Sequence, residues 1–179
     1  NFKSNQLGQV GDTTMFYDEA GNMVSQEQND DILSYHYDQK NRLIEVQMHG
    51  EAQTVPLLKY QYDADGVRMS KDISENASKV FYMRSGLNVY SEYNDLGLLH
   101  HYIYYDDRKI ARLTPSDENP NGFITEFYHA DYTGSIRRLS DANGNVVWGA
   151  DYFAFGGLRK SYGEGFNRWN STGGEFDET

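Results

Sequence analysis

The side chains of this sequence that most invite a chemical role are carboxylates and histidines, and thiolate chemistry is excluded because the chain contains no cysteine. It has 27 Asp and Glu residues, so a carboxylate pair acting as acid and base, as in glycoside hydrolysis, is one hypothesis. No pattern brings two carboxylates within catalytic distance, and most identifiable Asp residues fall in turn motifs. We therefore predict no catalytic residue and interpret the carboxylates as turn caps and solvated surface.

Three patterns invite a metal-ion interpretation. His100 and His101 are adjacent, so on a strand they point to opposite faces and cannot reach one ion. His129 and Asp131 could share a face, and we interpret them as a structural hydrogen-bonding pair at the base of a hairpin. The stretch "DADG" at 63–66 begins like a calcium loop but lacks the third acidic ligand and the terminal Glu. We predict no metal site and no cofactor.

Two arginines, Arg137 and Arg138, precede Asp141 closely and could clamp an anion. An ion pair between neighbouring strands is the interpretation we prefer. Trp148 and Trp169 are likewise interpreted as packing residues rather than as a platform for a ligand.

The overall charge and hydropathy exclude several classes of partner. A net charge of −11 without a long basic run is atypical of a nucleic-acid-binding surface. No stretch approaches the 18 or so apolar residues that a membrane-spanning helix needs. The first residues lack the basic and then apolar pattern of a signal peptide. We expect the chain to be an interior piece of a longer protein.

A turn motif recurs along the chain. Tyr-Asp, two variable residues and then Gly or Asn occur at 17–21, 37–41 and 62–66. The Asp can cap a type I turn, and the last position takes the left-handed conformation that Gly and Asn tolerate best. Related tips at 94–97, 131–134 and 141–144 give six candidate hairpin turns. The residues of the three Tyr-Asp copies are Tyr17, Asp18, Gly21, Tyr37, Asp38, Asn41, Tyr62, Asp63 and Gly66.

The segments between these turns alternate in polarity with a period of two, as in "LIEVQM" at 43–48 and "LLHHYIYY" at 98–105. In the second copy we expect Ile44, Val46 and Met48 to line one face of the returning strand. Fifteen Tyr and nine Phe favour β structure, and no segment predicts a useful amphipathic helix. The predicted fold is all-β, with antiparallel hairpin repeats forming a curved sheet.

The segments "NQLGQVGDTTMFYDEAGNM", "YHYDQKNRL" and "YQYDADGVRM" resemble the tyrosine-aspartate (YD) repeats of Rhs proteins, Tc toxin C-type subunits and teneurins. The segment "FYHADYTGSIRRLSDANGNVVWGADYFAFGGLRK" resembles the start of the Rhs repeat-associated core. That second resemblance includes His129, Asp131, Gly134, Arg137, Asp141, Gly144, Phe155 and Gly156. We accordingly expect YD-repeat hairpins over 1–113, a loop or seam at 114–122, and the start of the core over 123–179.

The resemblance implies a segment of a β-shell that encloses a C-terminal toxin, in a bacterial protein that is secreted or delivered to a cell surface. Its expected partners are the remaining repeats of its own shell and the enclosed toxin. In the family the core releases the toxin by self-cleavage at an aspartate-bearing segment, which we expect beyond Thr179. A second hypothesis is an adhesion module that binds a cell-surface glycan or protein through its tyrosine-rich sheet.

Overall fold

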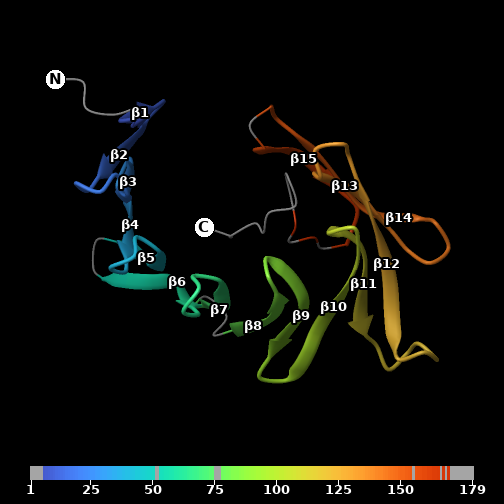
Figure 1. Cartoon of the computed structure of the whole chain (residues 1–179). Coiled ribbons are helices and arrows are strands. Elements are labelled where there is room, and N and C mark those ends of the chain that lie inside the picture. Colours follow the sequence, from blue (N-terminus) through green and yellow to red (C-terminus); the bar gives the residue numbers. More distant parts are fainter. Residues whose placement is uncertain are drawn as a thin grey trace. The chain divides into compact units, whose positions relative to one another are not determined.

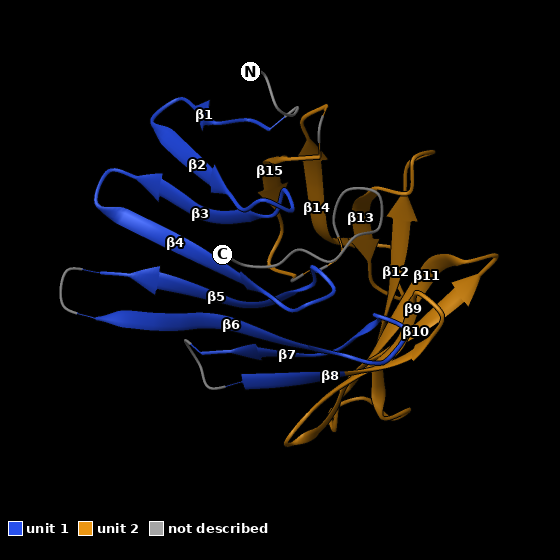
Figure 2. Cartoon of the chain, turned by 60° about the vertical axis from the view of Figure 1, so that its left-hand side comes forward, with its two compact units in different colours: residues 1–81 blue, residues 82–179 orange. Residues whose placement is uncertain are grey.

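The computed structural model describes residues 6–50, 53–74, 78–154, 156–165, 167 and 169. Every regular element in that part is a β-strand, fifteen in all (Figure 1). The chain divides into two compact units, residues 1–81 and 82–179, which are described separately (Figure 2). No helix long and apolar enough to cross a bilayer occurs in these described ranges.

Within each unit the strands pair antiparallel in chain order. The first unit contains β1 (Gln9–Val10), β2 (Thr13–Tyr17), β3 (Met23–Gln28), β4 (Asp31–Tyr37), β5 (Leu43–His49), β6 (Thr54–Tyr62) and β7 (Arg68–Ile73). Strand β8 (Ser78–Ser85) pairs with β7 and contains the boundary between the units. The second unit continues with β9 (Asn88–Asn94), β10 (Gly97–Tyr105), β11 (Arg108–Pro115), β12 (Phe123–Ala130), β13 (Ile136–Ser140), β14 (Val146–Tyr152) and β15 (Leu158–Tyr162). The prediction of an all-β, antiparallel fold is confirmed.

A β-bulge beside each Tyr-Asp turn corrects one predicted face. His36 pairs with Glu45, but Tyr37 pairs with Leu43, so Ile44 is an extra residue on β5. The expectation that Ile44 shares a face with Val46 and Met48 is therefore wrong. Leu43 packs on the core in its place.

The core of the first unit is a small cluster built on the middle of the sheet. Val46, Leu58 and Tyr60 are almost completely buried, and Tyr35 packs against them. Val46 and Leu58 are direct partners across β5 and β6, so the cluster is held by cross-strand pairs. Met48 lies near the end of its strand and is 38% exposed.

The second unit buries charged residues together with its aromatic ones. Its buried apolar side chains are Tyr82, Val89, Tyr102, Ala111, Tyr128, Ile136, Leu139, Trp148, Ala150 and Trp169. Glu92, Arg112 and Glu126 are buried among them. Buried charges need partners of opposite charge or hydrogen bonds, so these three side chains must be paired within the unit.

The predicted loop at 114–122 begins in a strand, because β11 extends to Pro115. The connection to β12 closes through hydrogen bonds from the Ser116 N–H to the Gly122 carbonyl at 2.9 Å and from the Gly122 N–H to the Asn119 carbonyl at 2.8 Å. The two compact units divide elsewhere, between residues 81 and 82. The assignment of 1–113 to repeats and 123–179 to the core stays a prediction.

Candidate functional site

Five of the six predicted hairpin tips share one backbone geometry. At the first, the Asp18 N–H donates to the Asn22 carbonyl at 2.9 Å, and the Gly21 N–H donates to the Asp18 carbonyl at 3.2 Å. The tips that begin at Asp38, Asp63, Asp131 and Asp141 repeat both bonds. This is a type I turn followed by a left-handed residue. Asn41 occupies that last position with φ of 57°, as Gly21 does with φ of 92°.

The Asp side chain caps its own turn. Asp18 Oδ1 accepts from the Asn22 N–H at 2.8 Å, and the same bond reaches Arg42, Val67, Ser135 and Asn145 at the other four tips. At Asp18, Asp38, Asp131 and Asp141, side-chain donors add to this bond and lower the pKa of the carboxyl below its ordinary value. The largest contributors are Asn22 at Asp18, Arg42 at Asp38, Thr133 at Asp131 and Asn145 at Asp141. The caps therefore stabilise the fold while ionised.

Acid is expected to destabilise the chain through these caps. Their folded pKa values lie below the value of about 3.9 for Asp in an unfolded chain. The stabilisation is therefore complete above that value and is lost as the pH falls through the lowered folded pKa values. Urea unfolding between roughly pH 6 and pH 3 measures this loss. Asp38→Asn is expected to make the free energy of unfolding depend less steeply on pH. Asp95→Asn, at the β9–β10 turn, is the control and should keep the slope of the unaltered chain. Equal slopes for the two variants would refute the cap assignment.

Two turns depart from the predicted motif. Asn94 pairs directly with Gly97, so this tip is a two-residue turn, and Asn94 Oδ1 accepts from the Leu96 N–H at 2.9 Å. A further tip was missed by the sequence interpretation. The Phe153 N–H donates to the Gly157 carbonyl at 2.8 Å, and the Gly156 N–H donates to the Phe153 carbonyl at 3.0 Å, with Phe where the other tips have Asp. Phe155 lies outside the described residues.

At several tips, a tyrosine on the incoming strand bonds to a backbone carbonyl earlier in the chain. The Tyr37 hydroxyl donates to the Met23 carbonyl at 3.0 Å, and the Tyr62 hydroxyl donates to the Leu43 carbonyl at 2.7 Å. The same type of bond joins Tyr17 to Leu7, Tyr104 to Val89 and Tyr152 to Ile136. We call these bonds tyrosine latches. Burial raises the pKa of Tyr152 to about 12, so the phenol stays a donor at neutral pH.

Arg42 extends the connection from tip to tip. Its Nε donates to Asp38 Oδ2 at 2.7 Å, its Nη1 donates to the Asp63 carbonyl at 3.0 Å, and its guanidinium lies 4.9 Å from the centre of the Tyr62 ring. Lys40 adds a bond from its Nζ to the Ala64 carbonyl at 3.2 Å. One hairpin is thus fastened to the next by side chains as well as by strand pairing.

Arg137 repeats this arrangement in the second unit. Its Nε donates to Asp131 Oδ2 at 3.0 Å and its guanidinium lies 5.3 Å from the centre of the Tyr152 ring. The predicted ion pair is present, and its partner is Asp131 rather than the nearby Asp141. Arg138 instead stacks on the Tyr162 ring at 5.0 Å. On β13, Arg138 is opposite His129 and Ile136 is opposite Ala130. Arg137, between them, is therefore the extra residue of the β12–β13 bulge.

The histidines bond to hydroxyls on neighbouring strands. His129 Nε2 lies 2.8 Å from Ser140 Oγ, so the predicted pair with Asp131 is not formed. His100 Nδ1 lies 3.0 Å from Thr114 Oγ1 on β11, and His101 Nδ1 lies 2.8 Å from Ser91 Oγ on β9. The two adjacent rings thus turn to opposite neighbours. In the described part of the chain no three His, Asp or Glu side chains gather as a metal site would require.

A buried cluster in the second unit was not predicted. The Tyr102 hydroxyl donates to Glu92 Oε1 at 3.0 Å, and Arg112 forms a salt bridge with Glu126. Trp169 packs edge-on against Tyr102, with ring centres 5.7 Å apart. These strands alternate in polarity, so a sequence pattern alone marks the charged positions as solvated.

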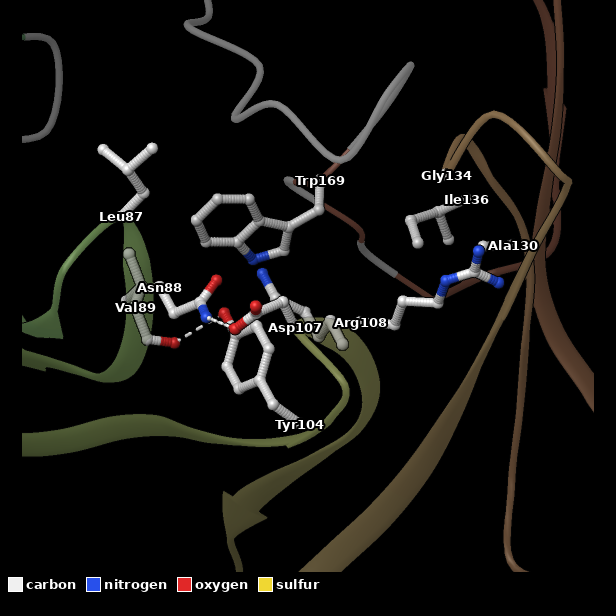
Figure 3. Close-up of a pocket in the computed structure, with 11 residues that line it drawn as sticks. Leu87, Asn88, Val89, Tyr104, Asp107, Arg108, Ala130, Gly134, Ile136 and Trp169 are labelled. Atoms are coloured by element: carbon white, nitrogen blue, oxygen red, sulfur yellow. Dashed lines mark hydrogen bonds between the residues drawn. The ribbon is translucent and has the colours of Figure 1, made fainter.

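Trp169 is brought to this cluster by the chain after β15. The Gly165 N–H donates to the Val147 carbonyl at 3.0 Å. Gly163 has φ of 90°, and a side chain there would clash with the same carbonyl. The close approach to β14 therefore requires glycine. Trp169 then forms one wall of a pocket of about 400 Å³ (Figure 3).

Comparison with known proteins identifies the repeats. A family model described as "RHS protein" matches residues 126–162. The chain is 30% identical over 178 residues to the tRNA3(Ser)-specific nuclease WapA of Bacillus spizizenii, and 31% identical over 178 residues to the tRNA nuclease WapA of Bacillus subtilis strain 168. The chain is an Rhs/YD-repeat protein. Both alignments cover 97% of this chain but only 7% of the relative, so the chain spans a small part of the length of these relatives.

The fold of the Rhs/YD-repeat chain also has a solved counterpart. The Photorhabdus luminescens Tc holotoxin pore matches with a TM-score of 0.63 at 15% identity, over 92% of this chain and 11% of that chain. At this identity the likeness concerns the fold. It agrees with the predicted class of antiparallel YD-repeat hairpins.

The tyrosine latch explains the Tyr of the YD repeat, and removing one hydroxyl tests it. Tyr37→Phe keeps the ring but leaves the Met23 carbonyl without its donor. We expect a loss of about 0.5–1.5 kcal/mol in the free energy of unfolding, as is typical of a single hydrogen bond. Urea titration followed by circular dichroism measures it. Tyr132→Phe is the control, because Tyr132 is 93% exposed. A Tyr37 variant as stable as this control would show that the latch contributes nothing.

Proposed function

We propose that the chain is a wall segment of the β-shell of a bacterial Rhs/YD-repeat toxin, and that the shell encloses a C-terminal toxic polypeptide. The observation that supports this function is the repeated fastening of one hairpin to the next through tyrosine latches and Arg42. Strand pairing alone leaves a hairpin ribbon free to slip or peel at its edges. Side-chain bonds between hairpins oppose this slipping and peeling, which supports a role in a wall.

We infer that this segment has no catalysis of its own. The turn carboxylates, which are its most regular acidic groups, are each occupied as caps. The nuclease activity in the names of the relatives belongs to proteins of which the chain spans 7%, and a net charge of −11 is unsuited to binding tRNA. We place self-cleavage beyond Thr179 and propose secretion or delivery to a cell surface for the complete protein.

Limited proteolysis of the complete protein that contains this chain tests enclosure. The C-terminal polypeptide is expected to resist protease in the intact protein and to be digested once the wall is unfolded by urea. A C-terminal polypeptide digested equally fast in both states would contradict the proposal. The double variant Arg42→Ala/Tyr62→Phe is expected to lower the urea concentration at which protection is lost.

A recognition module is the second candidate, and one feature of the second unit favours it. Four large side chains at its turns are almost fully presented to solvent. They are Leu87, Leu96, Tyr105 and Tyr132, with exposures of 86%, 95%, 76% and 93%. Exposed aromatic side chains such as Tyr132 are typical contact residues of surfaces that bind a glycan or a protein. Binding of the chain to a cell surface, abolished by Tyr132→Ala but not by Phe16→Ala, would support this function; binding that both variants retain would contradict it.

A further inference from the structure

Two of the five histidines lie on one face of neighbouring strands in the first unit, where β4 and β5 run side by side (Figure 2). On β4, Ser34 precedes His36 by two residues, and residues two apart on a strand share a face. On β5, Gln47 pairs with Ser34 and precedes His49 by two residues. The side chains of His36, Ser34 and His49 therefore project from the same side of the sheet. The buried Val46, next to Gln47, belongs to the opposite face, which forms the core cluster.

The two imidazoles converge on one hydroxyl. His49 Nε2 lies 2.7 Å from Ser34 Oγ, and His36 Nε2 lies 3.5 Å from the same atom. The two nitrogens are thus no farther apart than the sum of these distances. Two nitrogens bound to one Zn²⁺ at about 2.0 Å lie roughly 3 Å from each other. His36 is exposed, so its ring can rotate to close the remaining gap.

The second nitrogen of His49 is held from a third strand. His49 Nδ1 lies 2.9 Å from Thr54 Oγ1 at the start of β6. When Nδ1 carries the proton, it donates to this oxygen, and Nε2 keeps its lone pair on the side of Ser34. Metal-binding histidines almost always have their other ring nitrogen bonded in this way, which fixes the tautomer and the orientation of the ring. His49 is therefore oriented as a metal ligand before any ion binds.

The ligand set determines which ions fit. Within the described residues no third His, Asp or Glu joins His36 and His49, so the other positions fall to Ser34 Oγ and water. Imidazole suits Cu²⁺ and Zn²⁺, whereas Mg²⁺ and Ca²⁺ prefer carboxylate and carbonyl oxygens. Cu²⁺ accepts a planar set of nitrogen and oxygen ligands and binds a given set more tightly than the other divalent ions of its row. The net charge of −11 also attracts cations to the chain.

The other three histidines are arranged differently. His100 and His101 turn to opposite neighbouring strands and cannot meet at one ion. His129 bonds to Ser140, and its direct strand partner is Arg138, whose positive charge repels a metal ion.

We propose that His36 and His49 bind a divalent transition-metal ion, Cu²⁺ most tightly, with Ser34 Oγ and water as the remaining ligands. The site goes beyond the wall function and does not depend on it. The pair is not apparent in the sequence, because the two residues meet only through the pairing of β4 with β5.

Isothermal titration of the 179-residue chain with Cu²⁺, Zn²⁺ and Mg²⁺ in slightly alkaline buffer tests the proposal. Cu²⁺ is expected to saturate one site, Zn²⁺ to compete for it more weakly, and Mg²⁺ not to compete. His36→Ala and His49→Ala should each weaken Cu²⁺ binding by at least about tenfold. Losing a group that only orients a ligand already costs about 10- to 100-fold, and each of these variants removes a ligand itself.

Electron paramagnetic resonance of the bound Cu²⁺ adds a readout that does not depend on affinity. It should report two nitrogen ligands in the unaltered chain and one in His36→Ala. His129→Ala is the matched control, since His129 is also exposed and also bonded to a serine, and it should keep both the affinity and the two nitrogen ligands. Circular dichroism confirms that the variants are folded. The proposal is overturned if Cu²⁺ saturates no site, if Mg²⁺ displaces Cu²⁺, or if His36→Ala and His129→Ala bind Cu²⁺ alike.

Discussion

Replacing Glu126 with alanine is expected to lower the free energy of unfolding by about 3–5 kcal/mol. Glu126 forms a salt bridge with Arg112, and the two side chains are only 11% and 6% exposed. Burial of the guanidinium opposes its charge, yet the hydrogen bond and charge of Glu126 raise the pKa of Arg112 above its ordinary value. A guanidinium stays protonated in proteins even without a carboxylate partner, so the substitution leaves a buried charge unpaired, which is strongly destabilising.

Urea unfolding followed by tryptophan fluorescence measures this effect, because Trp148 and Trp169 both lie in the second unit. Glu45→Ala removes the Glu45–Lys59 pair, in which the lysine side chain is 52% exposed, and should cost about 1 kcal/mol or less. The double substitution Arg112→Met/Glu126→Leu should recover most of the stability, since an apolar pair can replace a buried ion pair. If Glu126→Ala were no less stable than Glu45→Ala, the Arg112–Glu126 pair would not be buried in solution.

The hairpin tips could be predicted from sequence because their physics is local. An Asp that caps its own turn and a Gly or Asn three residues later specify the backbone without any distant contact. The tip at 153–156 was missed because Phe153 supplies the backbone bonds without the carboxylate. The sequence signal that remained there was Gly156 alone.

The faces of the strands could not be predicted from alternation alone. A bulge beside the tip inserts Ile44 and moves Leu43 onto the core face, so the period of two is interrupted where each turn begins. On β12 burial is the reverse of what side-chain polarity suggests, because Phe127 is 42% exposed while Glu126 is buried. The partner of Glu126 lies 14 residues away on another strand, which no local pattern records.

The tyrosine latch was visible in sequence only as an unexplained regularity. Tyr17, Tyr37 and Tyr62 each precede an Asp, and the turn accounts for the Asp but not for the Tyr. The acceptor of each hydroxyl is a backbone carbonyl, which for Tyr37 and Tyr62 belongs to the previous hairpin, and a carbonyl has no residue-type signature. The repeat is therefore defined by a contact between copies.

Replacing Leu58 with alanine is expected to destabilise the first unit by about 2–5 kcal/mol. Leu58 is 1% exposed and pairs with Val46 on one side and Ile73 on the other. Truncating it removes buried methyl groups and leaves a cavity in a cluster that has few other members. Because the same side chain links β5, β6 and β7, its loss weakens successive hairpins together.

Circular dichroism during urea unfolding measures the loss in the first unit, which contains neither tryptophan. Leu7→Ala is the matched control, since Leu7 is 56% exposed and accepts the Tyr17 latch through its backbone carbonyl, which the substitution keeps. It should change the free energy of unfolding by less than about 0.5 kcal/mol. Val46 and Leu58 are in contact, so their substitutions should not be additive. The loss in free energy of unfolding of the double variant Leu58→Ala/Val46→Ala should differ from the sum of the two single losses by at least about 0.5 kcal/mol. Strict additivity would indicate that Val46 and Leu58 do not pack together, and equal stability of the Leu58 and Leu7 variants would remove Leu58 from the core.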